Sequence, residues 1–133
     1  LRDRQSLAYT VSAMHVYGLD EGYFGFYIGT SPDKVSQALG GLYAQIDALL
    51  QAPVTADELQ RAKRGLAGAH AIGLQRRSSR TAMIGLNELY GLGREAWHGH
   101  QRKLQAVTTE DVLAAARRYL TVGRHVEVVL APG

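Results

Sequence analysis

The spacing of the apolar residues changes once along this chain, at Thr30-Ser31-Pro32-Asp33. Before this point, residues 7–17 and 23–29 have the strand-like alternation and the β-branched and aromatic residues that favour β-strands. After it, apolar residues recur at three- and four-residue spacing, which is typical of amphipathic helices. The Gly18–Gly22 segment has the composition of a turn, so the two strand-like runs are expected to form an antiparallel hairpin.

Helix start and stop signals divide the remainder of the chain. Ser31, Thr55 and Thr108 are good N-cap residues, and an acidic residue stands three positions after each of the two threonines. Gly91-Leu92-Gly93 is a stop signal, and Arg76–Arg80 predicts an exposed stretch or a kink. The predicted helices run from about Pro32 to Gln51, from Thr55 to Tyr90 with that interruption, from Glu95 to Gln105 and from Thr108 to Leu120.

The chain ends in a short apolar alternation, Val126 to Leu130, which predicts a third strand. Strands at both ends and helices between them favour the α+β class. The expected architecture is a single domain over residues 1–133, with about four helices on one face of a small, mainly antiparallel sheet. The helix that begins at Thr55 is expected to turn Leu59, Ala62 and Leu66 inward.

Composition and charge exclude several classes of function. The chain has no cysteine, so disulfides and thiolate metal sites are excluded. The net charge of +3 is spread among acidic residues, which disfavours nucleic-acid binding. No apolar run approaches the ~18 residues of a membrane span. The first residue is Leu1 rather than Met, and both a cytoplasmic and a periplasmic location stay open.

A search for catalytic or metal-ligating motifs finds none that is complete. The histidines do not form His-x-x-Glu-His or His-Glu-x-x-His, and no Gly-x-Ser-x-Gly motif is present. His98 and His100 are the only close pair, and side chains two residues apart on a helix diverge. We therefore expect no metal site and no cofactor in these residues. The basic region from Arg61 to Arg80 is expected to be a solvated face, and its role stays open.

Four segments of the chain have a recognisable sequence in a fixed order: Leu1–Val11, Gly25–Thr30, Val54–Lys63 and Val107–Val112. Together they resemble the pitrilysin/insulinase family of metallopeptidases, which includes mitochondrial processing peptidase. The first segment is similar to the family's L-R-x-K-x-G-L-A-Y-x-V, with Arg4 and Ser6 in place of its usual Lys and Gly. The other three resemble its second strand and two of its helix starts.

The resemblance implies that the chain is the second half of one family unit and begins at the boundary between the halves. In that family, zinc is held by His-x-x-Glu-His and a later Glu in the first half of a catalytic unit, and the partner unit supplies an Arg and a Tyr. These two fall on Arg2 and Tyr9. The implied partners are a peptide or protein substrate and the missing half or a zinc-bearing subunit.

Physical chemistry is consistent with such a role for this pair. A guanidinium such as that of Arg2 offers a fixed fork of donors to substrate oxygens, and the Tyr9 hydroxyl can donate to a developing oxyanion. The plainer alternative is that Arg2 is a solvated charge and Tyr9 a packing residue. The predicted function is therefore the substrate-binding, zinc-free half of a zinc peptidase, inactive alone. The alternative is a non-catalytic assembly subunit of the same fold. A half-unit with open sheet edges is also expected to form a homo-oligomer.

Overall fold

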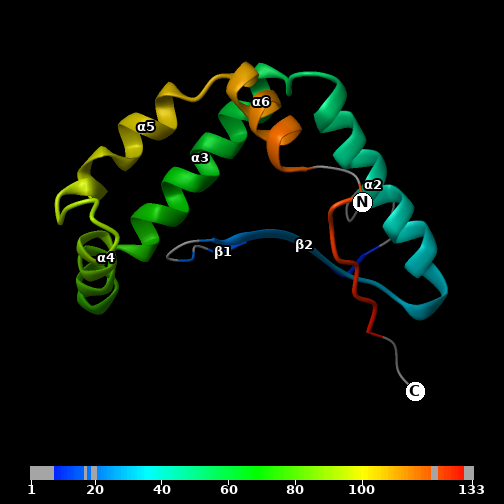
Figure 1. Cartoon of the computed structure of the whole chain (residues 1–133), viewed down its shortest axis with the longest axis horizontal. Coiled ribbons are helices and arrows are strands. Elements are labelled where there is room, and N and C mark those ends of the chain that lie inside the picture. Colours follow the sequence, from blue (N-terminus) through cyan, green and yellow to red (C-terminus); the bar gives the residue numbers. More distant parts are fainter. Residues whose placement is uncertain (1–7, 17, 19–20, 121–122, 131–133) are drawn as a thin grey trace. The chain divides into compact units, whose positions relative to one another are not determined.

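The computed structural model describes residues 8–16, 18, 21–120 and 123–130 (Figure 1). It contains two strands, β1 and β2, five α-helices, α2 to α6, and two short 3-10 helices, η1 and η2. The predicted α+β class is thus confirmed. The elements are β1 (Thr10–Val16), β2 (Tyr23–Gly29), η1 (Pro32–Lys34), α2 (Val35–Gln51), α3 (Ala56–Gly73), α4 (Arg77–Leu89), η2 (Ala96–Gly99), α5 (His100–Ala106) and α6 (Thr109–Tyr119).

The chain divides into two compact units. Unit 1 comprises Leu1–Ala52 and Arg117–Gly133, and unit 2 comprises Pro53–Ala116. Unit 1 therefore holds the sheet and α2, whereas unit 2 holds α3, α4, α5 and most of α6. Among the described residues, no helix is both long and apolar enough to cross a membrane.

The hairpin of unit 1 has the predicted antiparallel pairing. Its register runs from Thr10 opposite Gly29 to Val16 opposite Tyr23. Phe24 and Phe26 share one face and meet edge to face, with ring centroids 5.1 Å apart. Every residue of β1 is exposed, whereas β2 is partly covered. The hairpin thus has an apolar face that the described part of the chain does not bury.

The predicted third strand, Val126 to Leu130, is wrong. The described sheet contains only β1 and β2, and residues 125–130 belong to no strand. Val126 and Leu130 are 89% and 93% exposed. Alternating apolar residues indicate which face of a strand would be buried. A strand also needs the edge of another strand with which to form backbone hydrogen bonds. No such edge is paired with this segment in the described structure.

The starts of α3 and α6 follow the sequence signals closely, whereas the break expected at Arg76–Arg80 lies earlier, because α3 ends at Gly73 and α4 begins at Arg77. The Thr55 side chain accepts from the Glu58 N–H, and the Glu58 carboxylate accepts from the Thr55 N–H, which completes a capping box. Thr108 and Asp111 exchange the same two bonds at the start of α6, at 2.9 and 3.1 Å. Gly91 and Gly93 both have positive φ, so the stop after α4 uses the left-handed conformation that glycine tolerates.

The inward face of α3 differs from the prediction. Leu66 is 56% exposed, whereas Lys63 is only 5% exposed. The Lys63 ammonium donates to the Gln105 carbonyl oxygen at 2.7 Å, near the end of α5. Because the last carbonyls of a helix carry partial negative charge, a buried ammonium is stabilised there. Apolar spacing alone could not identify a buried cation.

The capping box at Thr55 generates a stability prediction. Replacement of Thr55 by Ala removes the acceptor of the Glu58 N–H and should lower the free energy of unfolding by about 1 kcal/mol. Urea denaturation followed by circular dichroism measures this change. Ser36→Ala, an exposed change in the first turn of α2, is the matched control and should leave stability within about 0.5 kcal/mol. Equal midpoints for both variants would contradict the capping role.

Candidate functional site

The two residues that the sequence singles out are Arg2 and Tyr9. Arg2 lies outside the described residues. Tyr9 lies immediately before β1, rather than inside the strand as expected, and its backbone N–H donates to the Gly29 carbonyl at 2.8 Å. Its side chain is 76% exposed. The backbone of Tyr9 is therefore fixed by the hairpin, whereas its phenol is open to a ligand.

A second polar cluster in unit 1 joins α2 to the C-terminal segment. The Tyr43 hydroxyl donates to Glu127 Oε2 at 2.7 Å and lies 2.9 Å from His125 Nε2. The hydrogen bond to Glu127 raises the pKa of the Tyr43 phenol above its ordinary value, because the neutral hydroxyl is the donor. His125 and Glu127 both contact the Tyr43 hydroxyl, so this side chain connects α2 to the segment that was expected to be a strand.

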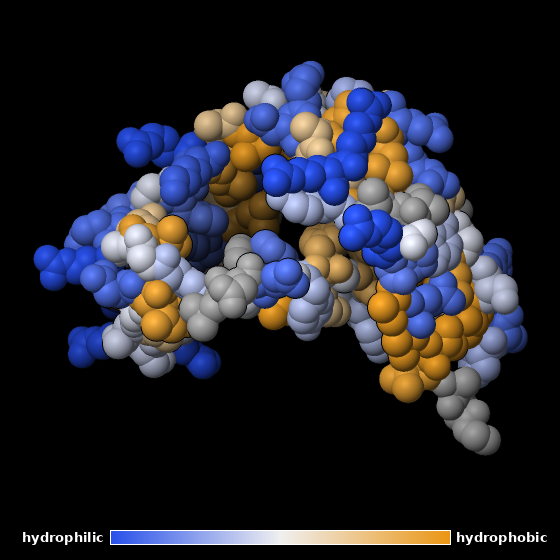
Figure 2. All heavy atoms as spheres, in the orientation of Figure 1, coloured by the Kyte–Doolittle hydropathy of each residue, from blue (hydrophilic) through white to orange (hydrophobic). Residues whose placement is uncertain are grey.

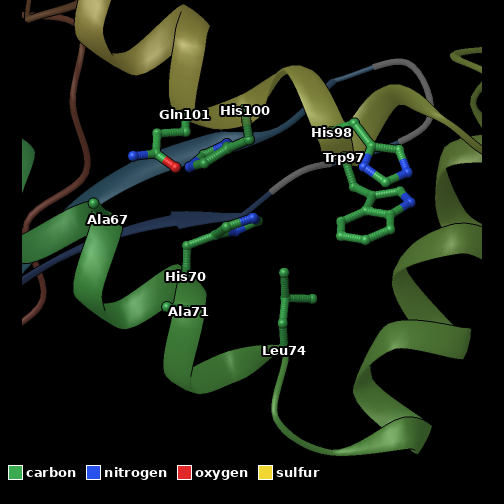
Figure 3. A pocket seen from close by; sticks show the side chains of 8 residues that line it. All are labelled: Ala67, His70, Ala71, Leu74, Trp97, His98, His100 and Gln101. Atoms are coloured by element: carbon green, nitrogen blue, oxygen red, sulfur yellow. The ribbon is translucent and has the colours of Figure 1, made fainter.

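Unit 2 contains a pocket that the sequence did not predict. Its volume is about 390 Å³, and it lies between one face of α3 and the η2–α5 segment (Figure 3). The α3 side chains recur at three- and four-residue spacing, which places them on one helix face. The lining consists of Ala67, His70 and Ala71 from α3, of Leu74 at the C-cap of α3, and of Trp97, His98, His100 and Gln101 from η2 and α5.

Two imidazoles stack across this pocket. The rings of His70 and His100 have centroids 4.0 Å apart and an interplanar angle of 22°, and Figure 3 shows one above the other. Burial first, and then the nearby His100, lower the pKa of His70 below its ordinary value. His70 is therefore mainly neutral at pH 7.

The predicted divergence of His98 and His100 is visible in the same view. His98 lies against Trp97, with ring centroids 3.8 Å apart, and its Nε2 is 3.0 Å from Glu95 Oε2. His100 turns instead to His70. Among the described residues, no three histidine, aspartate or glutamate side chains are grouped so as to hold a metal ion. The sequence gave no signal for the His70–His100 contact, because the two residues belong to different helices.

Comparison with known proteins finds a family match in the first part of this chain. Residues 1–66 match the family described as the Peptidase M16 inactive domain. This match spans the opening segment and two of the other three segments that resemble the insulinase-type metallopeptidases. It confirms the predicted family resemblance: the first 66 residues of the chain match the inactive domain of the M16 peptidases.

Similar protein sequences extend this match over almost the whole chain. An uncharacterised zinc protease of Mycobacterium tuberculosis is 31% identical over 99% of this chain, which spans 30% of that protein. An uncharacterised zinc protease of Streptomyces coelicolor is 30% identical over 90% of this chain, which spans 26% of it. The chain therefore corresponds to less than a third of the length of either relative.

Solved structures share the fold at lower identity. A candidate zinc protease of Bordetella pertussis superposes with a TM-score of 0.79 at 22% identity, over 96% of this chain and 70% of the other. A protease of Helicobacter pylori gives a TM-score of 0.75 at 20% identity, over 91% of this chain and 29% of the other. At such identities the likeness concerns the fold.

Proposed function

We propose that this chain is the zinc-free half of a zinc peptidase and binds substrate on behalf of a metal site in another part of the protein or in a partner subunit. The observation that carries the proposal is the match of residues 1–66 to an inactive peptidase domain. That stretch includes Arg2 and Tyr9, the two residues that the family resemblance assigns to the substrate. Zinc in the catalytic half would supply an activated water for attack on the peptide carbonyl.

The proposed roles of the two side chains differ in when they act. The Arg2 guanidinium holds carbonyl or carboxylate oxygens of the bound substrate, so its contribution is to binding. The Tyr9 hydroxyl donates to the carbonyl oxygen as negative charge develops on it, so its contribution is to the transition state. The exposure of the Tyr9 side chain supports this role, because a phenol buried in a core could not reach a substrate.

Replacement of these residues in the full-length, zinc-loaded protein tests the proposal. Tyr9→Phe should lower kcat about a hundredfold, because one oxyanion donor is lost. Arg2→Ala should act chiefly by raising KM, by about tenfold or more, because a charged hydrogen bond is lost from the bound substrate. Cleavage of a fluorogenic peptide measures both parameters.

Matched controls separate these roles from general damage. Tyr23→Phe changes another exposed tyrosine of the hairpin, and Arg4→Ala removes a neighbouring charge. Both should keep full activity, and all four variants should keep the zinc content of the parent. Undiminished cleavage by Tyr9→Phe and Arg2→Ala would contradict the substrate role. It would favour the alternative, a non-catalytic assembly subunit of the same fold.

The proposal also concerns what covers the exposed apolar side chains. Figure 2 shows hydrophobic residues open to the surface. The exposed large side chains of the described residues include several from the hairpin. In the whole protein we expect the catalytic half to cover this surface, whereas the isolated chain should use a second copy. The exposed hairpin residues concerned are Val11, Met14, Val16, Tyr23, Phe24 and Tyr27.

Light scattering of the isolated 133-residue chain measures this self-association. The expected mass is at least twice the 14.5 kDa of one chain at micromolar concentration. Met14→Lys, which adds a charge to the exposed strand, should shift the mass toward that of one chain. A mass of 14.5 kDa for the unmodified chain at every concentration would contradict self-association through this surface.

A further inference from the structure

We propose that the pocket in unit 2 binds a small organic acid, a carboxylate attached to an aromatic or branched aliphatic body. The site is separate from the proposed role of Arg2 and Tyr9, because its lining comes from α3, the C-cap Leu74 of that helix, η2 and α5. Its volume of about 390 Å³ falls within the range of ~300–1,000 Å³ in which small-molecule pockets lie.

The apolar part of the pocket suits the body of such a ligand. Ala67 and Ala71 present methyl groups from α3, Leu74 follows at the C-cap of this helix, and Trp97 lines the pocket from η2 (Figure 3). Alanines at two positions of this face leave the space that larger side chains would fill. An aromatic ring gains both burial and contact with the indole in such a space.

The polar side chains of the pocket can all donate a hydrogen bond. His70, His98, His100 and Gln101 all line it, and no carboxylate does. The stacked imidazoles of His70 and His100 face each other rather than an acidic residue. A proton on either ring is therefore uncompensated within the pocket, and a bound carboxylate would supply the missing negative charge.

The charged side chains around the pocket are otherwise engaged or point elsewhere. Lys63 of α3 donates to the Gln105 carbonyl, and Glu95 pairs with His98. The Lys103 side chain of α5 lies beside Gly99, the last residue of η2. Arg80 and Glu88 of α4, which packs against η2, are both exposed. None of these groups lines the pocket between His70 and His100.

Proton linkage then sets the sign of the pH dependence. Binding of an anion favours protonated imidazole, so it raises the pKa of the histidines that it contacts. Binding is therefore coupled to proton uptake, and the affinity for the acid rises as the pH falls. A rise of one unit in the pKa of one histidine on binding corresponds to an increase of about tenfold in affinity.

Trp97 is the only tryptophan of the sequence, so its fluorescence reports on the pocket directly. The test titrates the 133-residue chain, and then the full-length protein, with 3-phenylpropionate at pH 6 and pH 8. The expected result is saturable binding that is about tenfold tighter at pH 6. The uncharged 3-phenylpropionamide should bind at least tenfold more weakly than the acid at pH 6 and show no dependence on pH.

Conservative variants distinguish the pocket from unspecific effects. His100→Gln keeps a planar polar side chain but cannot be protonated, and should reduce the pH dependence of binding. Replacement of both His70 and His100 by Gln should reduce it to less than twofold, because His98 already pairs with Glu95. Leu74→Asp places a carboxylate in the lining and should abolish binding of the acid. Gln60→Ala, an exposed change on α3 outside the pocket, is the control and should bind as the parent does.

Circular dichroism confirms that each variant keeps its helices before it is titrated. The proposal is overturned if the fluorescence of the parent chain does not saturate, or if acid and amide bind equally at pH 6. It is overturned equally if folded His100→Gln retains the full pH dependence. None of these outcomes bears on Arg2 and Tyr9, so this inference and the proposed function fail independently.

Discussion

A two-stranded hairpin is too narrow to bury an apolar face on its own, and this constraint governs unit 1. β1 is exposed along its whole length, and β2 is only partly covered. The hairpin nevertheless fixes the backbone of Tyr9 through the bond to Gly29. The exposure of the hairpin thus leaves its apolar residues uncovered and the Tyr9 phenol accessible. Both features are expected of a domain that completes its core and its function against another part of a larger protein.

Local signals in the sequence were sufficient to predict most of the helical structure. Side-chain caps act within one turn, so Thr55 and Thr108 identified the starts of α3 and α6 without knowledge of their surroundings. The glycines after α4 identified its end for the same reason. The family, too, followed from short segments, because the match over residues 1–66 covers the opening motif.

Features that depend on contacts between distant segments could not be predicted in this way. Val126 to Leu130 has the alternation of a strand but no paired edge in the described structure, and Tyr43 holds the residues beside it. Lys63 is buried because the end of α5 lies within reach of its ammonium. The His70–His100 stack likewise joins two helices whose spacing in the sequence says nothing of their contact. In each case the structure of the residue depends on a partner from a distant segment, and a single sequence does not reveal which segment that is.

The account rests on the claim that this chain contributes to a zinc peptidase without holding the zinc. Metal analysis of the purified 133-residue chain and of the full-length protein, both after dialysis against one micromolar zinc, tests that claim most directly. The account predicts about one zinc per catalytic unit in an assembly that contains the His-x-x-Glu-His half, and less than a tenth of an equivalent in the isolated chain. One tightly held zinc per isolated chain would contradict it.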